Sequence, residues 1–162
     1  MNILVSACLL GFDVKYSSEN NSHLIDPQKL ERIQKMANII PFCPEIYGGL
    51  ETPRPSCEIK EDKVLTKDGQ DRTEAYKKGA GQALMAARLF KCTHALLKEK
   101  SPSCGTGIIY DGSFTHTEKE GDGVTAALLR ENNIKLYGES QIDQLIEAIR
   151  LAKAPQQLSF EF

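Results

Sequence analysis

Hydrophobic and polar positions follow two patterns along the chain. Short apolar runs predict buried strands at residues 2–7, 39–40, 95–97 and 134–137. Between them, apolar residues recur at intervals of three and four, which predicts helices after Asp26, from residue 71 to 90, over 123–130 and over 142–152. Strands that alternate with helices are joined by crossovers and therefore run parallel. The pattern predicts a single-domain α/β protein whose mostly parallel sheet is flanked by helices.

Capping and turn residues mark where several of these elements begin. Asp26 followed by Pro27 is typical of an N-cap and a first helical turn. Asp71 and Glu74 resemble a capping box at the start of the longest helix. Two glycines of that helix, at positions 79 and 81, predict close packing against a neighbouring element. Weaker patterns predict small hairpins at residues 59–66 and 108–116.

Length and composition limit how the chain is organised. A chain of 162 residues fits one domain, since domains usually contain about 100–200 residues. We expect that domain to span residues 1–154 and residues 155–162 to form a loosely attached tail. With 41% hydrophobic and 26% charged residues, the chain is too apolar for an intrinsically disordered protein.

Charge and hydropathy exclude two classes of partner. The 20 basic and 22 acidic residues give a net charge of -2, so no global positive field exists to hold duplex nucleic acid. No apolar run approaches the ~20 residues that a membrane span requires, and the first residues lack the basic segment of a signal peptide. The sequence therefore predicts a cytoplasmic protein with neither a membrane nor duplex nucleic acid as a partner.

Three of the five cysteines occupy equivalent places in the predicted sheet. Cys8, Cys43 and Cys104 each come after an apolar strand, and each opens a loop that contains Gly or Pro. The carboxyl ends of parallel strands meet at one edge, which is where Rossmann-like folds place their sites. We therefore expect the three thiols to lie together. The alternative is that they are small buried hydrophobes, which is a common role of cysteine.

The residue types around these thiols favour one kind of metal centre. An odd number of cysteines in a reducing compartment argues against a disulfide framework. Zinc sites commonly bring their ligands in close C-x-x-C pairs, and the sequence contains no such pair. Thiolates without histidine partners favour iron and sulfur. A four-iron cluster normally takes four thiolates, so three would leave one iron open to polarise a substrate as a Lewis acid.

The remaining cysteines and the histidines carry weaker signals. Cys92 follows the longest helix, where a buried structural thiol is the favoured interpretation. Cys57 lies in the loop after Cys43, and its role stays open between a fourth ligand, an accessory thiol and an ordinary loop residue. The histidines at positions 23, 94 and 116 show no mutual spacing, so we assign them no role.

Four long motifs carry a resemblance to a known family. They are SACLLG at residues 6–11, CPE-x-x-GG-x-x-TPRP at 43–55, KEKSPSCGTGIIYDG at 98–112 and GVTAALLR at 123–130. In this order and spacing they cover most of the chain. The sequence resembles the thiouracil desulfidase family, which was formerly a bacterial domain family of unknown function.

The resemblance implies a cofactor and a reaction. The matching positions imply a 4Fe-4S cluster on Cys8, Cys43 and Cys104 with one open iron. Many relatives carry another cysteine shortly after the first motif, where residues 14–16 of this chain read VKY, so no ligand is expected there. The implied activity is non-redox, hydrolytic removal of sulfur from a thiolated uracil onto the cluster. The implied partner is a small-molecule thiolated nucleobase or nucleotide, such as 2-thiouracil, 4-thiouracil or 4-thio-UMP, which becomes uracil or UMP.

Hydrolysis also needs groups that move protons and hold the substrate. Glu45 is the carboxylate nearest to Cys43 in the sequence, and we expect it to act as acid and base, with Ser101 as its catalytic partner. Either residue could instead bind loop amides. Backbone amides and polar side chains of the glycine-containing loops could hold the base or a phosphate. These expected substrate contacts are Ser103, Gly48, Gly49, Arg54, Gly105 and Thr106.

Two functions of other classes stay open at this point. One is a non-catalytic iron–sulfur or zinc-binding module, including a redox sensor that uses Cys57 as a resolving thiol. The other is a nucleotide-binding regulatory domain whose cysteines are incidental. Release of sulfide from a thiolated uracil would separate the enzyme from both.

Overall fold

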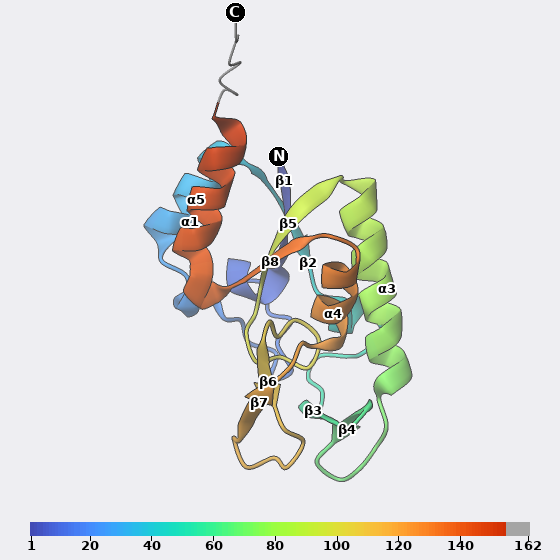
Figure 1. Cartoon of the computed structure of the whole chain (residues 1–162). Helices are drawn as coiled ribbons and strands as arrows, with labels where there is room; N and C mark the ends of the chain where they lie inside the picture. Colours follow the sequence, from blue (N-terminus) through green and yellow to red (C-terminus); the bar gives the residue numbers. More distant parts are fainter. Residues whose placement is uncertain (155–162) are drawn as a thin grey trace, which may run out of the picture.

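A four-stranded parallel sheet forms the centre of the computed structural model, which describes residues 1–154 (Figure 1). In spatial order its strands are β2 (Asn38–Phe42), β1 (Asn2–Ser6), β5 (Cys92–Leu97) and β8 (Lys135–Gly138). Each neighbouring pair is parallel. The predicted α/β class and the mostly parallel sheet are therefore confirmed, whereas the tail expected at residues 155–162 lies outside the described residues.

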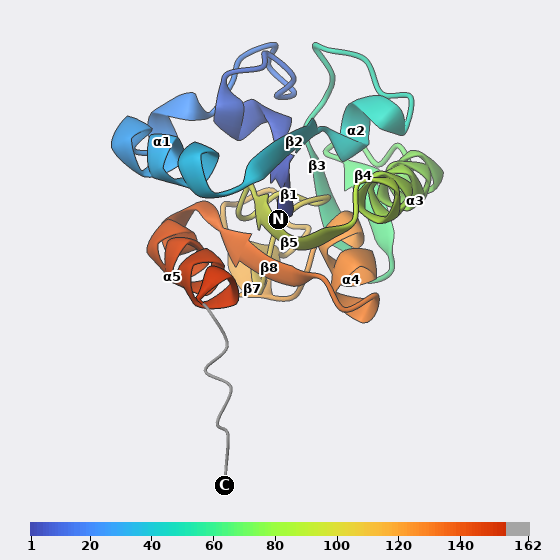
Figure 2. The same cartoon turned by 90° about the horizontal axis from the view of Figure 1, so that it is seen from above.

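Two helices cover each face of this sheet (Figure 2). On one face lie α1 (Pro27–Met36) and α5 (Ile142–Lys153), and on the other lie α3 (Thr73–Leu89) and α4 (Val124–Glu131). The spacing of apolar residues predicts all four helices, and the structure confirms them. Within residues 1–154, none of the helices combines the length and the apolar character that spanning a bilayer requires.

Successive residues of the central strand β1 supply two hydrophobic layers. Ile3 and Val5 join the cluster that contains Ile33 of α1. Leu4 joins the opposite cluster with Ala83 of α3. Side chains alternate between the two faces of a strand, and both faces of this sheet are covered by helices. Burial on both sides explains why β1 is a continuous apolar run in the sequence.

The helix starts agree with the sequence for α1 and only in part for α3. Asp26 caps α1, since its Oδ1 accepts a hydrogen bond of 2.8 Å from the Gln28 amide. Asp71 likewise accepts from the Thr73 amide at 2.8 Å. The predicted capping box does not close, because α3 begins at Thr73 and Glu74 is its second residue rather than its third.

Close packing is confirmed for one of the two glycines of α3. A Cβ on Gly79 would lie 2.0 Å from the first carbonyl oxygen of α2 (Pro44–Tyr47), a short helix that the sequence pattern does not predict. A Cβ on Gly48 would lie 2.2 Å from the Ala75 carbonyl oxygen of α3. Gly81 faces open space. The backbones of α2 and α3 therefore touch, and this contact fixes the place of the residues on α2.

Two antiparallel hairpins lie beyond the carboxyl ends of the sheet strands (Figure 1). They consist of β3 (Cys57–Lys60) with β4 (Lys63–Thr66), and of β6 (Ile108–Tyr110) with β7 (Glu118–Glu120). The predicted return strand at residues 114–116 is wrong, because β7 begins two residues later. Phe114 and His116 both have a φ of 57°, which a strand residue does not adopt.

Candidate functional site

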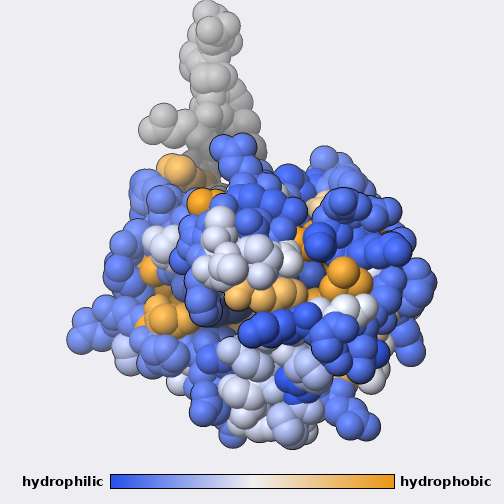
Figure 3. Space-filling model, turned by 90° about the horizontal axis from the view of Figure 1, so that it is seen from below, coloured by the Kyte–Doolittle hydropathy of each residue, from blue (hydrophilic) through white to orange (hydrophobic). Residues whose placement is uncertain are grey.

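A cavity of about 420 Å³ lies at the carboxyl ends of β1, β2 and β5. We call it the thiol cavity, because its wall contains four of the five cysteines, namely Cys8, Cys43, Cys57 and Cys104. Figure 3 looks onto this end of the molecule, where apolar and weakly polar residues surround a hollow in a mostly hydrophilic surface. Six of the residues expected in the site line the cavity, namely Cys8, Cys43, Cys104, Glu45, Ser101 and Ser103.

Each thiol is placed by the end of a different strand. Cys8 lies on η1 (Ala7–Leu10), the 3₁₀ turn that follows β1. Cys43 directly follows β2 and precedes α2, and its carbonyl accepts a hydrogen bond of 3.1 Å from the Tyr47 amide. Cys104 lies in the loop after β5. The three strands are neighbours in the sheet, so their ends bring together thiols that are far apart in the sequence.

The loop that carries Cys104 is held by its own serines and by α4. Ser101 Oγ accepts hydrogen bonds from the amides of Ser103, at 3.1 Å, and Cys104, at 3.2 Å. The Ser103 carbonyl accepts the Thr125 amide of α4 at 2.9 Å. A Cβ on Gly123, before α4, would lie 2.5 Å from that same carbonyl oxygen. The loop is therefore rigid where it enters the cavity.

Burial raises the pKa of all three thiols. For Cys104, which is 4% exposed, desolvation is the largest cause, and charge on Cys8 and Cys43 raises its pKa further. Hydrogen bonds with Ser6 and Ser103 act in the opposite direction. Cys104 thus lies close enough to Cys8 and to Cys43 to be affected by charge on either thiol. When a metal binds the sulfur of such a buried thiol, the metal replaces the thiol proton.

The thiols that follow the three sheet strands suit a centre with several metal atoms. The thiolates of a four-iron cluster bind different irons, so they stand around the cluster rather than around one point. Cys8, Cys43 and Cys104 come from three strand ends and face a shared space. Within the described residues, no three Cys, His, Asp or Glu side chains converge as they would around a single ion.

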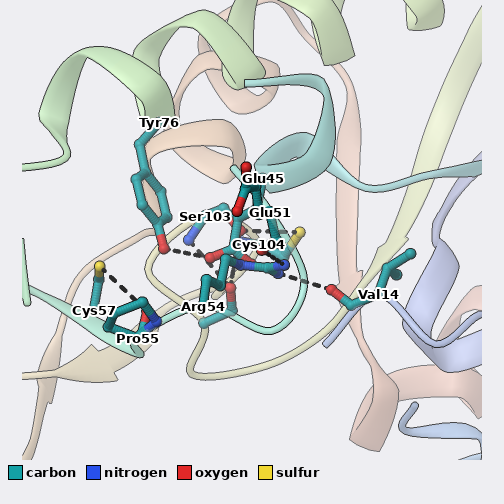
Figure 4. A network of polar contacts seen from close by, with 10 residues as sticks. Val14, Glu45, Glu51, Arg54, Pro55, Cys57, Tyr76, Ser103 and Cys104 are labelled. Carbon is teal, nitrogen blue, oxygen red and sulfur yellow. Dashed lines mark hydrogen bonds and ion pairs between the residues drawn. The ribbon is translucent and has the colours of Figure 1, made fainter. Parts of the chain in front are cut away.

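Glu45 presents a partnered carboxylate to the cavity (Figure 4). The Tyr76 hydroxyl of α3 donates to Glu45 Oε1, and Arg54 Nη2 donates to Oε2 at 3.2 Å. Arg54 also donates to the carbonyls of Val14, at 2.8 Å, and Glu51, at 3.1 Å. Its side chain is 5% exposed and that of Glu45 is 17% exposed. Both carboxylate oxygens are therefore fixed by donors from elsewhere in the fold.

The hydroxyls of Ser101 and Ser103 line the cavity and already take part in hydrogen bonds within the protein. Their Oγ atoms are 3.0 Å apart, and Ser103 Oγ donates to the Cys104 sulfur at 3.7 Å. Ser101 Oγ also binds loop amides, which is the structural role left open for it above. The same atom can thus hold the loop and face the cavity.

Gly48, Gly49, Gly105 and Gly107 are not among the residues that line the thiol cavity. The four amides concerned already donate within the protein. Those of Gly48 and Gly49 donate to α2 carbonyls, that of Gly105 donates to Ser101 at 2.9 Å, and that of Gly107 donates to Asp122 at 2.7 Å. These glycines allow close packing instead. The phosphate cradle expected from these amides is not formed.

The other two expected substrate contacts also lie outside the cavity wall. Thr106 is not among the residues that line it. Arg54 lies behind Glu45 and borders, with Gly49, a separate groove beside the start of α3. Its guanidinium therefore faces Glu45 and not the space where a substrate would lie.

Sequence reasoning missed Tyr76 and left Cys57 and His116 without a role. Cys57 and His116 both line the thiol cavity. Tyr76 is 1% exposed and stands at helical spacing among apolar residues, so the pattern assigns it to the core. A buried phenol needs a hydrogen-bond partner, and that need is the signal that could have found it.

A comparison with protein families shows which family this chain belongs to. A family model for 2-thiouracil desulfurase matches residues 3–141, a range that contains Cys8, Cys43 and Cys104. The chain belongs to this family. The resemblance inferred from the four motifs is therefore confirmed.

Individual relatives agree with the family match over nearly the whole chain. The chain is 37% identical over 154 residues to the uncharacterized protein YbbK of Bacillus subtilis strain 168, which covers 89% of this chain and 99% of YbbK. It is also similar to a solved structure of the 4Fe-4S-dependent thiouracil desulfidase TudS. That match has a TM-score of 0.87 and 41% identity, and it covers 93% of this chain and 98% of TudS.

Proposed function

We propose that this protein is an iron–sulfur-dependent desulfidase that converts a thiolated uracil to uracil. The observation that carries the proposal is the meeting of three thiols and a carboxylate in one cavity at the ends of three neighbouring strands. Membership of the family and similarity to TudS support the same activity. The substrate is a thiolated nucleobase or its nucleotide.

The cofactor proposed is a 4Fe-4S cluster held by Cys8, Cys43 and Cys104. When bound by three protein thiolates, such a cluster supplies a Lewis-acidic iron that attracts the soft sulfur of a thiocarbonyl. Burial raises the pKa of these three thiols, and three buried thiolates need a cationic centre to balance their charge.

The protein's own residues supply the proton transfers. Water adds to the ring carbon, the carbon–sulfur bond breaks, and sulfur leaves as hydrosulfide, so no electron donor or acceptor is needed. Glu45 takes the proton from water and returns a proton to the departing group. The hydroxyls of Ser101 and Ser103 lie on the same wall and orient the water or the polar edge of the base.

The cavity also suits the proposed substrate in size and lining. Its volume of about 420 Å³ falls within the usual range for small-molecule sites of about 300–1,000 Å³. Tyr16 and Tyr110 contribute aromatic surface to its wall. Lys98 and Lys100 also line it, but they already pair with Glu139 and Glu118. The lining therefore offers more to the base than to a phosphate.

The test is an anaerobic turnover assay on the reconstituted full chain. We expect sulfide and uracil, or UMP, to appear in equal amounts from at least one of 2-thiouracil, 4-thiouracil and 4-thio-UMP. Protein kept free of iron is the control and should release no sulfide. Failure of iron-loaded protein to release sulfide from all three substrates would refute the proposal and favour a non-catalytic iron–sulfur module.

A further inference from the structure

A chain of polar side chains runs from α3 to the wall of the thiol cavity (Figure 4). The Tyr76 hydroxyl points at Glu45 Oε1, while Arg54 Nη2 binds Oε2. On its other side, Tyr76 packs in one cluster with Cys57, whose thiol donates to the Pro55 carbonyl at 3.9 Å. Nothing in the proposed reaction uses Tyr76 directly, since it is not part of the cavity wall. Its contact with Glu45 therefore needs its own explanation.

The place of the Tyr76 hydroxyl is fixed by packing. Its ring is 1% exposed and lies in a hydrophobic cluster with Val64 and Cys57. The helix that carries it touches α2, which carries Glu45, through the glycine backbones at positions 48 and 79. Neither helix can shift along the other without a clash. The geometry between the phenol and the carboxylate is therefore set by the fold and does not depend on a substrate.

Tyr76 acts as a donor and not as an acid. Burial and the neighbouring negative charge of Glu45 raise the pKa of Tyr76 far above its usual range, so its proton stays on the phenol. The single hydroxyl proton is directed to Glu45 Oε1. The phenol thus holds one carboxylate oxygen permanently, as Arg54 holds the other.

We propose that Tyr76 is a positioning residue for Glu45. A carboxylate bound at one oxygen can turn about its last side-chain torsion, whereas donors at both oxygens fix its plane. Arg54 alone would leave Oε1 free. With Tyr76 present, the lone pairs that face the cavity keep one direction toward the water that Glu45 must deprotonate. This role rests on the proposed function, because it has meaning only if Glu45 moves protons.

The direct test is Tyr76→Phe, which removes the hydroxyl and keeps the ring. We expect kcat to fall by about tenfold to a hundredfold, as small misplacements of catalytic groups do, with KM changed by less than about twofold. Iron and sulfide content after reconstitution should equal that of the unchanged protein. Tyr137→Phe is the matched control, since Tyr137 lies on β8 outside the cavity wall, and its kcat should stay within about twofold.

A double variant separates positioning from general damage. If Tyr76 acts through Glu45, adding Tyr76→Phe to Glu45→Gln should lower the residual rate no further. A structural role would lower both backgrounds by the same factor and would overturn the proposal. A crystal structure of the Tyr76→Phe variant gives a readout without turnover: we expect the Glu45 side chain to turn or to occupy two conformers. A carboxylate that keeps its place in that variant would contradict it.

The failures of the two proposals are distinguishable. If Glu45→Gln loses turnover while Tyr76→Phe keeps the kcat of the unchanged protein, the reaction stands and the positioning role is wrong. If Glu45→Gln keeps full turnover, the role of Glu45 is wrong, and that of Tyr76 falls with it. Thermal unfolding of every variant shows whether the fold survives, and the double variant still tests the role if Tyr76→Phe is less stable.

Discussion

The two ends of strand β5 carry two buried cysteines with different surroundings. Cys92 begins the strand and borders a small hollow of about 220 Å³ with Ala87 and Ile134. Burial is the cause of the raised pKa of Cys92. Cys104 lies beyond the other end, where the thiols of Cys8 and Cys43 also act on it. Burial alone therefore does not distinguish a structural thiol from a candidate ligand.

The difference comes from the direction of the strands. At the carboxyl edge of the sheet, the loops after β1, β2 and β5 turn into the same space. At the amino edge, the hollow beside Cys92 is lined by helix and strand residues such as Ala87 and Ile134 and by no other cysteine. A parallel sheet thus collects reactive side chains at one edge only, as in other folds of this type.

Replacing the cysteines at these two ends with serine should give the largest difference, which is in cluster assembly. We expect Cys104→Ser to abolish assembly of the cluster, because one of three thiolates is lost. Cys92→Ser should bind the same amounts of iron and sulfide as the unchanged protein. Iron and sulfide analysis after anaerobic reconstitution measures both. Equal losses in the two variants would mean that the comparison between the ends of β5 is wrong.

The second largest effect concerns two carboxylates of the cavity wall. Glu45→Gln removes the proposed acid and base, so kcat should fall by about a hundredfold or more while the cluster stays intact. Glu58 Oε1 already accepts the amides of Gly112, at 3.1 Å, and Phe114, at 3.2 Å. Glu58→Gln should therefore keep kcat within about threefold. Steady-state assays on variants with equal iron and sulfide content measure both kcat values. A larger loss of kcat in Glu58→Gln than in Glu45→Gln would assign the proton transfer to Glu58.

The contact behind Glu45 can be tested at the two glycines of α3. Gly79→Ala places a methyl group 2.0 Å from a backbone oxygen of α2, so we expect unfolding to become easier by about 2–3 kcal/mol. Gly81→Ala meets nothing within 4 Å and should stabilise the helix by about 0.5–1 kcal/mol. Denaturant unfolding of both variants measures the difference. Equal stability would show that α2 and α3 are not in contact.

The smallest effect is expected at the anchor of the loop after β5. Asp122 accepts from the Gly107 amide, at 2.7 Å, and from Arg130. These bonds outweigh burial and hold the pKa of Asp122 below its usual range, so its stabilisation is present at neutral pH and is lost as pH falls through that lowered pKa. Asp122→Asn should cost about 1 kcal/mol at pH 7 and less in acid. A pH-independent difference in unfolding free energy would contradict this.

Residues within or just after strands were the predictable part of the site. Cys8, Cys43 and Cys104 could be grouped from sequence because strand ends in a parallel sheet share an edge. Glu45 followed from its place two residues after Cys43. Each of these inferences needs only local pattern and topology, and the fold class follows from the same information.

The unpredictable part depends on contacts between elements. The pattern showed neither α2 nor the partners of Glu45, because Tyr76 lies 31 residues away and reads as a core position. The amides at Gly48 and Gly105 looked free in the sequence, yet the protein itself occupies them. A hydrogen bond that a glycine loop makes to its own fold has no signature in the order of residues.

The most direct measurement is a crystal structure of protein purified and reconstituted without oxygen, with anomalous scattering recorded at the iron edge. We predict four irons in the thiol cavity, three of them bonded to the sulfurs of Cys8, Cys43 and Cys104, and the fourth without a protein ligand. The prediction would be contradicted by iron located elsewhere. It would also be contradicted by a fourth iron that is bonded to Cys57 or another side chain and leaves no room for a substrate.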